Sequence, residues 1–335
     1  MLNKSNMKIK KVSIDYTQIN LSVNETGEEA IQYNTISRLI SRARLEDKPL
    51  IIVEGKDDIN IYEHFVQMAN VKATIRAIET IPGYSEGCTH VTRFIEEAQT
   101  EIKKTKENER FLLGIIDRDA SYFRNEIKKR TKCLFVLKAY SFESHFVSEK
   151  HLEYSVKNFI SSTASINNEI INYIYKGFLD KIEIYYYLSL EALRNACAKN
   201  YKGLLGYKVN YGYIDKNPDI ITKVLLKKEK LDNYSKLRKI PHLDITIIKG
   251  KWLLDLFIET IYERIKSLSY HCSHNTLLNG QERCFFCESG IMNKCSWSPK
   301  KHHDKIILKN LVLQHFDENE TSYIVDRIKM LGSAV

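Results

Sequence analysis

The sequence predicts an α/β fold: a doubly wound, mostly parallel four-stranded sheet followed by a mainly α-helical C-terminal region. Between residues 50 and 144, short apolar segments alternate with segments of helical periodicity. This order favours parallel strands, because a parallel pair needs a long crossover connection that is usually a helix. The most apolar segments lack polar alternation, as is typical of strands covered on both faces. We therefore divide the chain into residues 1–47 (an N-terminal segment and helix), 48–150 (the sheet domain) and 151–335 (the mainly helical region).

The individual elements follow from hydrophobic spacing and from breakers. Residues 28–46 carry apolar side chains at helical spacing, and Pro49 ends that pattern. Residues 50–53 predict a buried strand, and residues 57–70 predict a helix whose first-turn aspartates suit the helix dipole. The remaining predictions are strands at 73–78, 111–121, 132–144 and 243–248, and helices at 86–106, 252–268 and 318–331.

Composition and charge restrict the class of protein. The chain has 335 residues, of which 43% are hydrophobic and 28% are charged. Its beginning lacks the apolar core of a secretory signal, and its apolar runs are too short to span a bilayer, so we expect a cytoplasmic protein without membrane association. The net charge of +9 indicates a polyanionic partner such as nucleic acid, with a merely basic surface as the alternative. Seven cysteines in such a chain indicate a metal site or buried thiols rather than disulfides.

Carboxylates follow two of the apolar segments where each predicted strand ends. Glu54 ends the strand in "IIVEGKDD", and Asp117 and Asp119 end the strand in "LGIIDRDA". The carboxyl ends of adjacent parallel strands form one crevice, and alternate residues leaving a strand can point the same way. We therefore expect the three carboxylates to lie within about 6 Å of each other around one Mg²⁺ or Mn²⁺, which prefer oxygen ligands. The alternative is that they only initiate helices in an ordinary α/β domain.

These two motifs in their strand context resemble the TOPRIM domain. Topoisomerases, bacterial primases, recombination mediators and nucleases of the overcoming-lysogenization-defect type share that fold, and the resemblance covers residues 48–146. It implies that Glu54, Asp117 and Asp119 hold the catalytic metal. A topoisomerase would need further large domains with a strand-attacking tyrosine, and a primase would need a separate nucleotide-binding domain. A metal-dependent nuclease acting on RNA, such as tRNA, or on DNA is therefore the leading hypothesis.

A narrower resemblance rests on "VEGKDD", on "YSFESHF" and on the Gly-Lys of "IIKGKWLLDLF". These are similar to stand-alone TOPRIM proteins encoded beside ABC-type ATPases in bacterial anti-phage systems, among them the PARIS system. That group has "IENY" after the aromatic residue, so Glu143 alone carries over, as an additional metal ligand. The resemblance implies a toxic effector activated through an ABC-type ATPase partner, and we expect release as a homodimer. The alternative is a non-catalytic TOPRIM adaptor that binds nucleic acid or a protein partner.

Two residues next to Glu54 have both a functional and an ordinary interpretation. Lys56 can stabilise charge on a transferred phosphate, or it is a solvated lysine. Asp58 is a further metal ligand or a first-turn helix residue. The "EGK" motif is not a phosphate-binding loop of the Walker A type, because no glycine stands five residues before Gly55 and Asp57 follows the lysine.

The segment 271–303 is rich in cysteine and histidine. It contains one C-x-x-C motif, "CFFC", and four soft ligands in a short segment suit a tetrahedral structural Zn²⁺. We expect Cys284 and Cys287 to share this ion with two ligands from Cys272, Cys295 and the histidines at 271, 274, 302 and 303, with packed thiols as the alternative. The remaining cysteines, Cys88, Cys133 and Cys197, read as isolated packed residues.

Tyrosines alternate with lysines between residues 200 and 217. Lys202, Tyr207, Lys208 and Tyr211 form a candidate nucleic-acid-binding set, because aromatic rings stack on bases and lysines attract phosphates. The lysine-rich run 227–239 can similarly follow a phosphate backbone. The alternatives are tyrosines packed inside a helical domain and a solvated charged face.

Overall fold

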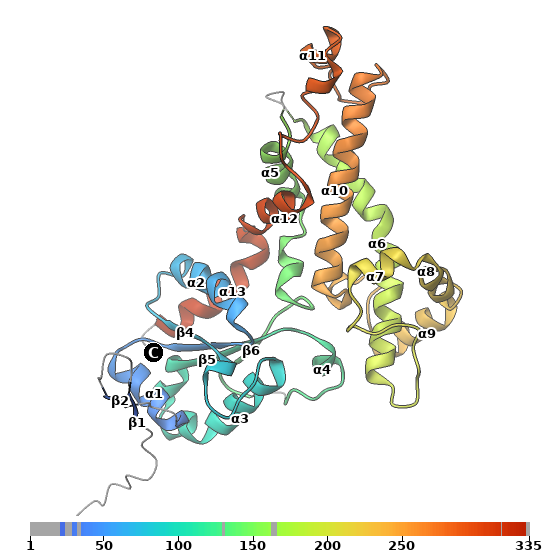
Figure 1. Ribbon diagram of the computed structural model, residues 1–335. Coiled ribbons are helices and arrows are strands. Elements are labelled where there is room, and N and C mark those ends of the chain that lie inside the picture. The colour runs from blue at the N-terminus through green and yellow to red at the C-terminus, as the bar shows by residue number, and fades with distance from the viewer. Residues whose placement is uncertain are drawn as a thin grey trace, which may run out of the picture.

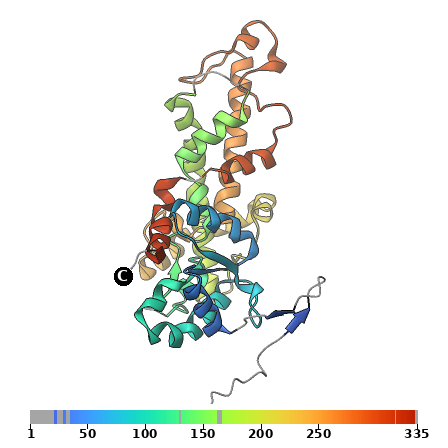
Figure 2. The ribbon, with the colours of Figure 1, turned by 90° about the vertical axis from the view of Figure 1, so that its left-hand side faces the viewer.

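The computed structural model describes residues 21–23, 29–31, 35–128, 131–161, 166–315 and 317–332. A parallel sheet with helices on both faces forms one end of the molecule, and an elongated bundle of helices rises from it (Figures 1 and 2). None of the described helices combines the length and apolar character needed to cross a membrane.

The sheet has four parallel strands in the order β4-β3-β5-β6. The strands are β3 (Leu50–Val53), β4 (Thr74–Ala77), β5 (Leu112–Ile116) and β6 (Leu134–Val136). The chain runs from β3 outward to β4 and then returns past β3 to form β5. The direction of winding therefore reverses between β3 and β5, and in such sheets the crevice at the carboxyl ends of these two strands is the usual ligand site. The predicted α/β class and four-stranded parallel sheet are confirmed.

The two faces of the sheet are covered by different helices, which explains the uninterrupted apolar sequence of β3. Ile51 and Val53 join the core beneath α2, whereas Leu50 and Ile52 join the core with α1 and α3. Alternate residues of a strand point to opposite faces, so a strand buried on both needs apolar side chains throughout. The covering helices are α1 (Ile36–Leu45), α2 (Ile59–Met68), α3 (Cys88–Lys104) and α13 (Glu318–Gly332).

Gly114, in the middle of β5, allows α3 to approach the sheet closely. A Cβ atom at this position would lie 2.6 Å from Cγ1 of Ile95. We expect Gly114→Ala to destabilise the protein by about 1–3 kcal/mol, as overpacking of a filled core usually does, and to lower the thermal midpoint. The control is Gly212→Ala, where the nearest atom to a new Cβ is Asn210 Oδ1 at 3.8 Å. Equal midpoints for the two variants would contradict the close approach.

The prediction of one helix over 28–46 is wrong at its beginning. Residues Glu29–Ile31 form strand β2, which pairs antiparallel with β1 (Leu21–Val23), and helix α1 begins only at Ile36. Thr35 caps this helix, with its side chain accepting a hydrogen bond from the Arg38 N–H at 3.4 Å. The apolar residue Ile31 therefore belongs to a strand, although its spacing suited the helix. The start of the chain, residues 1–20, lies outside the described residues.

Two long helices, α6 and α10, run side by side through the helical region (Figure 1). Large apolar side chains such as Trp252 and Phe257 are fully buried in this part of the core. The helices of this region are α5 (Glu149–Phe159), α6 (Asn168–Cys197), α7 (Tyr211–Lys216), α8 (Pro218–Leu225), α9 (Lys228–Arg238), α10 (Gly250–Ser273), α11 (Phe285–Glu288) and α12 (Lys305–Leu313). The α11 turn lies at the end of the bundle remote from the sheet.

The strand predicted at 243–248 is also wrong. Residues Ile245–Ile247 form the 3-10 turn η6, because the Asp244 side chain accepts a hydrogen bond from the Thr246 N–H at 2.9 Å. Short polar side chains that bond their own backbone compete in this way with strand formation.

Candidate functional site

Glu54 and Asp117 meet at the carboxyl ends of β3 and β5. Glu54 follows β3 directly, Asp117 follows β5 directly, and the Asp117 N–H donates a hydrogen bond to Glu54 Oε1 at 2.7 Å. The register of the parallel pair, with Ile52 opposite Gly114, brings the two strand ends to the same level. The structure thus places these carboxylates at the point of the sheet where the winding reverses.

Burial and neighbouring negative charge raise the pKa values of both carboxyl groups. Burial is the largest cause that raises the pKa of Glu54 from 4.5 to about 7, and the charges of Asp119 and Asp58 add to it. The N–H groups of Asp117 and Cys88 oppose this shift. The pKa of Asp117 is raised well above its ordinary value by burial first and then by the charge of Glu54. Two carboxylates in one partly buried site repel each other, so either a proton or a cation stabilises them.

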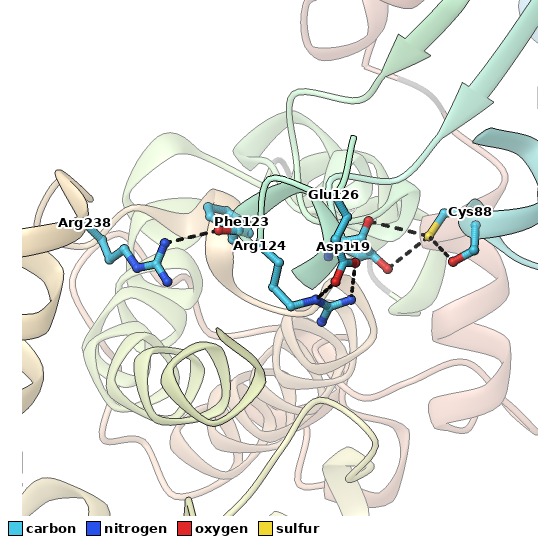
Figure 3. Close-up of polar contacts among 8 residues, drawn as sticks. Cys88, Asp119, Phe123, Arg124, Glu126 and Arg238 are labelled. Carbon is cyan, nitrogen blue, oxygen red and sulfur yellow. Dashed lines mark hydrogen bonds and ion pairs between the residues drawn. The ribbon is translucent and has the colours of Figure 1, made fainter. Parts of the chain in front are cut away.

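Asp119 stands at the beginning of α4 (Ala120–Phe123), where it caps that helix and contacts Cys88 (Figure 3). Its negative charge adds to the raised pKa of Glu54. Its Oδ1 accepts hydrogen bonds from the N–H and the hydroxyl of Ser121 at 2.8 and 2.5 Å. The Cys88 thiol donates to Asp119 Oδ2 at 3.3 Å. The sequence indicated that Cys88 is an isolated packed residue. The structure shows instead that its thiol belongs to the carboxylate site. Burial and the charges of Glu54 and Asp119 raise the pKa of its thiol to about 12, so it remains a neutral donor.

Asp58 and Lys56 differ in their positions beside Glu54. The Asp58 carboxylate accepts a hydrogen bond from the Gly55 N–H at 3.0 Å, which closes the turn η2 (Lys56–Asp58) in front of α2. Burial raises the pKa of Asp58, and the charge of Glu143 is the largest contribution from a neighbouring side chain. Lys56 is exposed at the same turn, and its backbone N–H donates to Glu79 Oε1 at 3.1 Å.

Glu143 reaches the site on the 3-10 turn η5 (Phe142–Phe146), which follows β6 and returns across the sheet edge. Its Oε2 accepts a hydrogen bond from the Ser141 hydroxyl at 2.5 Å, and Lys251 Nζ lies 3.9 Å from its Oε1. The N-terminus of α10 abuts this turn closely, because a Cβ on Gly250 would lie 2.2 Å from Ser141 Oγ. The Gly-Lys pair at the start of α10 therefore supports Glu143, and it does so without forming a nucleotide-binding loop.

Tyr62 of α2 is a site residue that sequence reasoning missed. It is only 4% exposed, and its pKa is raised by burial first and then by the charges of Asp117, Asp58 and Glu54. The hydrophobic pattern of α2 placed Tyr62 on the buried face, but a buried tyrosine most often only packs. Nothing in the pattern alone distinguished its hydroxyl from that of any other core tyrosine.

The carboxylates and the cysteines differ in how closely their donor atoms gather. Four cysteines place their sulfur atoms within 4.8 Å of one another: Cys272, Cys284, Cys287 and Cys295. Among the described residues, this is the group of three or more possible metal ligands that gathers so closely. Glu54, Asp117 and Asp119 share one edge of the sheet but do not form such a group. The cysteine cluster can hold a metal ion such as zinc, whose thiolate ligands stand at about 2.3 Å from the ion in a tetrahedron.

The four cysteines come from three separate pieces of chain at the remote end of the bundle. Cys272 ends α10, Cys284 and Cys287 flank and enter α11, and Cys295 follows the next turn. All four are buried, and Cys284, the most exposed, keeps 9% of its surface. Burial raises the pKa of the Cys272 thiol to about 11 and also raises that of Cys287. At Cys284, N–H groups of Ser296 and Cys287 together with the neighbouring thiols outweigh burial and lower the pKa to about 6. A thiol that ionises easily is the form that binds a metal.

Three of the four histidines near this cluster contact other groups. His271 Nδ1 bonds Thr276 at 2.9 Å, and His274 Nδ1 bonds the carbonyl of Tyr270 at 2.9 Å. The His303 ring lies against Phe159, with 5.6 Å between the ring centroids. The structure therefore gathers four cysteines, in which Cys272 and Cys295 complete the pair Cys284 and Cys287, as one of the ligand sets expected from the sequence.

The tyrosines of the candidate nucleic-acid set lie inside the helical region. The Tyr207 hydroxyl donates to the carbonyls of Ser189 and Ile247 at 3.2 and 2.9 Å. The Tyr211 ring stacks on Tyr185 with centroids 5.8 Å apart. Only the lysines of this set, Lys202 and Lys208, are exposed. The two rings are thus occupied by intramolecular contacts, as the packed alternative describes.

The chain matches no known protein-family model and no curated protein. Its function is therefore inferred from the sequence motifs and the geometry described above.

The raised pKa of Glu54 predicts that stability depends on pH. The folded protein retains a proton on Glu54 up to about pH 7, whereas the unfolded chain releases it near 4.5. Without divalent cations, stability should fall as pH rises between these values, by on the order of 1–3 kcal/mol. Glu54→Gln removes this dependence, so its thermal midpoint should exceed that of the wild type at pH 8 and match it at pH 5. If the thermal midpoints of Glu54→Gln and the wild type differ by the same amount at pH 5 and pH 8, the raised pKa of Glu54 is contradicted.

Proposed function

We propose that this protein is a divalent-metal-dependent nuclease of the TOPRIM type that hydrolyses phosphodiester bonds of nucleic acid. The observation that carries the proposal is the meeting of Glu54 and Asp117 across the switch point of a parallel sheet, joined by the 2.7 Å bond from the Asp117 N–H. Asp119 follows the same strand end, and its charge raises the pKa values of both carboxyl groups. The strand contexts of both motifs and the parallel topology support the resemblance to TOPRIM enzymes.

The donor set fits a hard cation such as Mg²⁺ or Mn²⁺. Burial and neighbouring carboxylates all raise the pKa of Asp117, and its carboxylate has no hydrogen bond or ion pair to any described residue. Glu54, Asp117 and Asp119 would hold the ion, with Asp58 and Glu143 available for a second, and oxygen ligands are those that these ions prefer. Such an ion, when bound, polarises a phosphate and lowers the pKa of a water molecule.

The surrounding side chains have defined tasks in this proposal. Ser121 and Cys88 hold the Asp119 carboxylate in one orientation through their hydrogen bonds. Lys56, exposed beside Glu54, supplies positive charge to a phosphate at the sheet edge. Lys251 lies near Glu143 on the other side of the site and balances its charge.

A second candidate is a non-catalytic adaptor in which this edge only binds nucleic acid or a protein partner. One observation favours it: both oxygens of Asp119 already accept hydrogen bonds, and the three carboxylates do not gather within 4.8 Å of one another. A fold of this kind can serve as a binding module.

We further propose that the nuclease is the toxic effector of an anti-phage system and that an ABC-type ATPase activates it, with the released protein acting as a homodimer. This part rests on the resemblance of the "VEGKDD" and "YSFESHF" segments to stand-alone TOPRIM effectors. A dimer would provide two copies of one active centre for paired cleavage.

The test is cleavage of RNA and DNA by the purified chain in Mg²⁺ or Mn²⁺, with and without an ATPase encoded beside it. Cleavage that requires the divalent ion and depends on the ATPase supports the whole proposal. Binding without cleavage under all these conditions would leave the adaptor in its place.

A further inference from the structure

A cavity of about 640 Å³ lies next to the carboxylates but is not lined by them. Its walls come from α4, from the connection between α4 and β6, and from the end of α9 with the turn that follows. Figure 3 shows Arg238 in contact with Phe123, with Asp119 at the start of α4. The volume is within the range of about 300–1,000 Å³ that small-ligand sites occupy.

Arg118 connects the cavity to the carboxylate site. It stands between Asp117 and Asp119 where the chain leaves β5, and successive side chains of an extended segment point to opposite sides. The carboxylates therefore face the sheet edge while Arg118 lines the cavity. Its Nη1 bonds the carbonyl of Lys138 at 3.1 Å, but its buried Nε has no hydrogen-bond partner among the described residues.

The cavity also contains an aromatic platform. The Arg118 guanidinium carbon lies 4.7 Å from the ring centre of Tyr122 and 5.3 Å from that of Phe123. Tyr122 remains 40% exposed although it lines the cavity. An aromatic ring supported by a guanidinium plane is a surface on which nucleobases of any sequence stack.

The charged groups of the wall are predominantly cationic. They are Arg118, Lys128, Arg238, Lys239 and Asp244. Lys128 is paired with Glu96 at 3.0 Å, and the Asp244 carboxylate accepts the Thr246 N–H. Arg238 donates to the Phe123 carbonyl at 3.2 Å, whereas exposed Lys239 forms no ion pair with the described residues. Because Lys128 is already paired, Arg238 and Lys239 are the cations of the wall that can attract an anion.

We propose that this cavity binds one nucleotide unit of a single-stranded nucleic acid, with its base on Tyr122 and its phosphate beside Lys239 and Arg238. Asp119 and Tyr122 belong to the same helical turn, so the cavity adjoins the carboxylate edge, and a strand bound here would pass around α4 to reach the carboxylates. The inference deepens the proposed function, on which it rests for nucleic acid as the substrate, and it makes a single strand the substrate class. The site is distinct from the Tyr207 and Tyr211 set, whose rings are occupied.

The test measures binding of a fluorescent single-stranded 15-mer of mixed sequence, as RNA and as DNA, without added divalent cation. Tyr122→Ala should weaken binding roughly 5- to 150-fold, the range expected for one base stacked on an aromatic ring, while Tyr122→Phe should retain it. Lys239→Gln should weaken binding and reduce the slope of log Kd against log salt by about 0.7, as for one phosphate contact on a single strand. Lys72→Gln, which removes the same charge from an exposed position before β4, at the amino ends of the strands, is the matched control.

If Tyr122→Ala and Lys239→Gln bind the 15-mer within about twofold of Lys72→Gln, the proposal is overturned. Competition by a free nucleoside monophosphate as strong as that by the 15-mer would also overturn it, since the cavity would then be a small-molecule site. The thermal midpoints of all variants establish that they fold. Strand binding through this cavity without cleavage in Mg²⁺, both with and without the ATPase, would refute the nuclease alone. Cleavage with unchanged binding in these variants would refute the cavity alone.

Discussion

Glu54→Gln is expected to abolish cleavage of nucleic acid while leaving the fold intact. The introduced amide keeps an oxygen that accepts the Asp117 N–H, so the local geometry at the 2.7 Å contact is preserved. The substitution removes the negative charge that the proposed cation needs. The rate should fall by more than about 100-fold, since changes to groups behind metal ligands already cost roughly 10- to 100-fold. A cleavage assay in Mg²⁺ that compares the purified variant with the wild type, each with and without the ATPase, measures this.

The matched control is Glu63→Gln, which removes the same charge from an exposed position of α2 in the same domain. It should cleave like the wild type. In cells, the wild type expressed without its ATPase partner should differ in toxicity from the wild type expressed with it, and Glu54→Gln should be harmless in both. Full toxicity from Glu54→Gln would remove Glu54 from the chemistry and favour the adaptor.

Loss of the cysteine cluster is expected to have the largest effect on stability. The purified protein should contain one zinc ion per chain, and Cys287→Ser should lose it, because Cys287 is buried within the group of four sulfurs. Structural zinc sites contribute directly to folding, with apparent binding energies of about 10–16 kcal/mol in small zinc domains. The thermal midpoint should fall by about 5 °C or more, since each kcal/mol shifts it by roughly 2–4 °C in domains of intermediate size.

Cys197→Ser provides the control, because Cys197 ends α6 and is not part of the four-cysteine group. It should retain one zinc ion, as measured by elemental analysis. A wild-type preparation that contains no zinc and whose four clustered thiols all react with a thiol reagent would show that the cysteines only pack. In that case Cys287→Ser should change the midpoint little more than Cys197→Ser does.

The sequence alone determined the sheet and the position of its acidic edge. Strands β3 and β5 are uninterrupted apolar runs, and each ends in a carboxylate, so parallel pairing places Glu54 and Asp117 together. Period and composition are local properties of the chain, and buried parallel strands express them directly. Hydrophobic composition predicted a strand after Asp244, and this was wrong because the Asp244 side chain caps the segment as a 3-10 turn.

Only the tertiary structure decided which distant residues share a site. Glu143 reaches Asp58 because η5 returns across the sheet edge, where Phe142 packs on Tyr62 and Phe65 of α2. Cys272 joins the C-x-x-C pair because α10 ends beside α11. The Tyr207 hydroxyl donates hydrogen bonds to backbone carbonyls inside the bundle. The cavity beside Arg118 exists only because the end of α9 lies opposite the connection after α4. Such contacts depend on the path of the whole chain, whereas hydrophobic periodicity reports only which face of an element is buried.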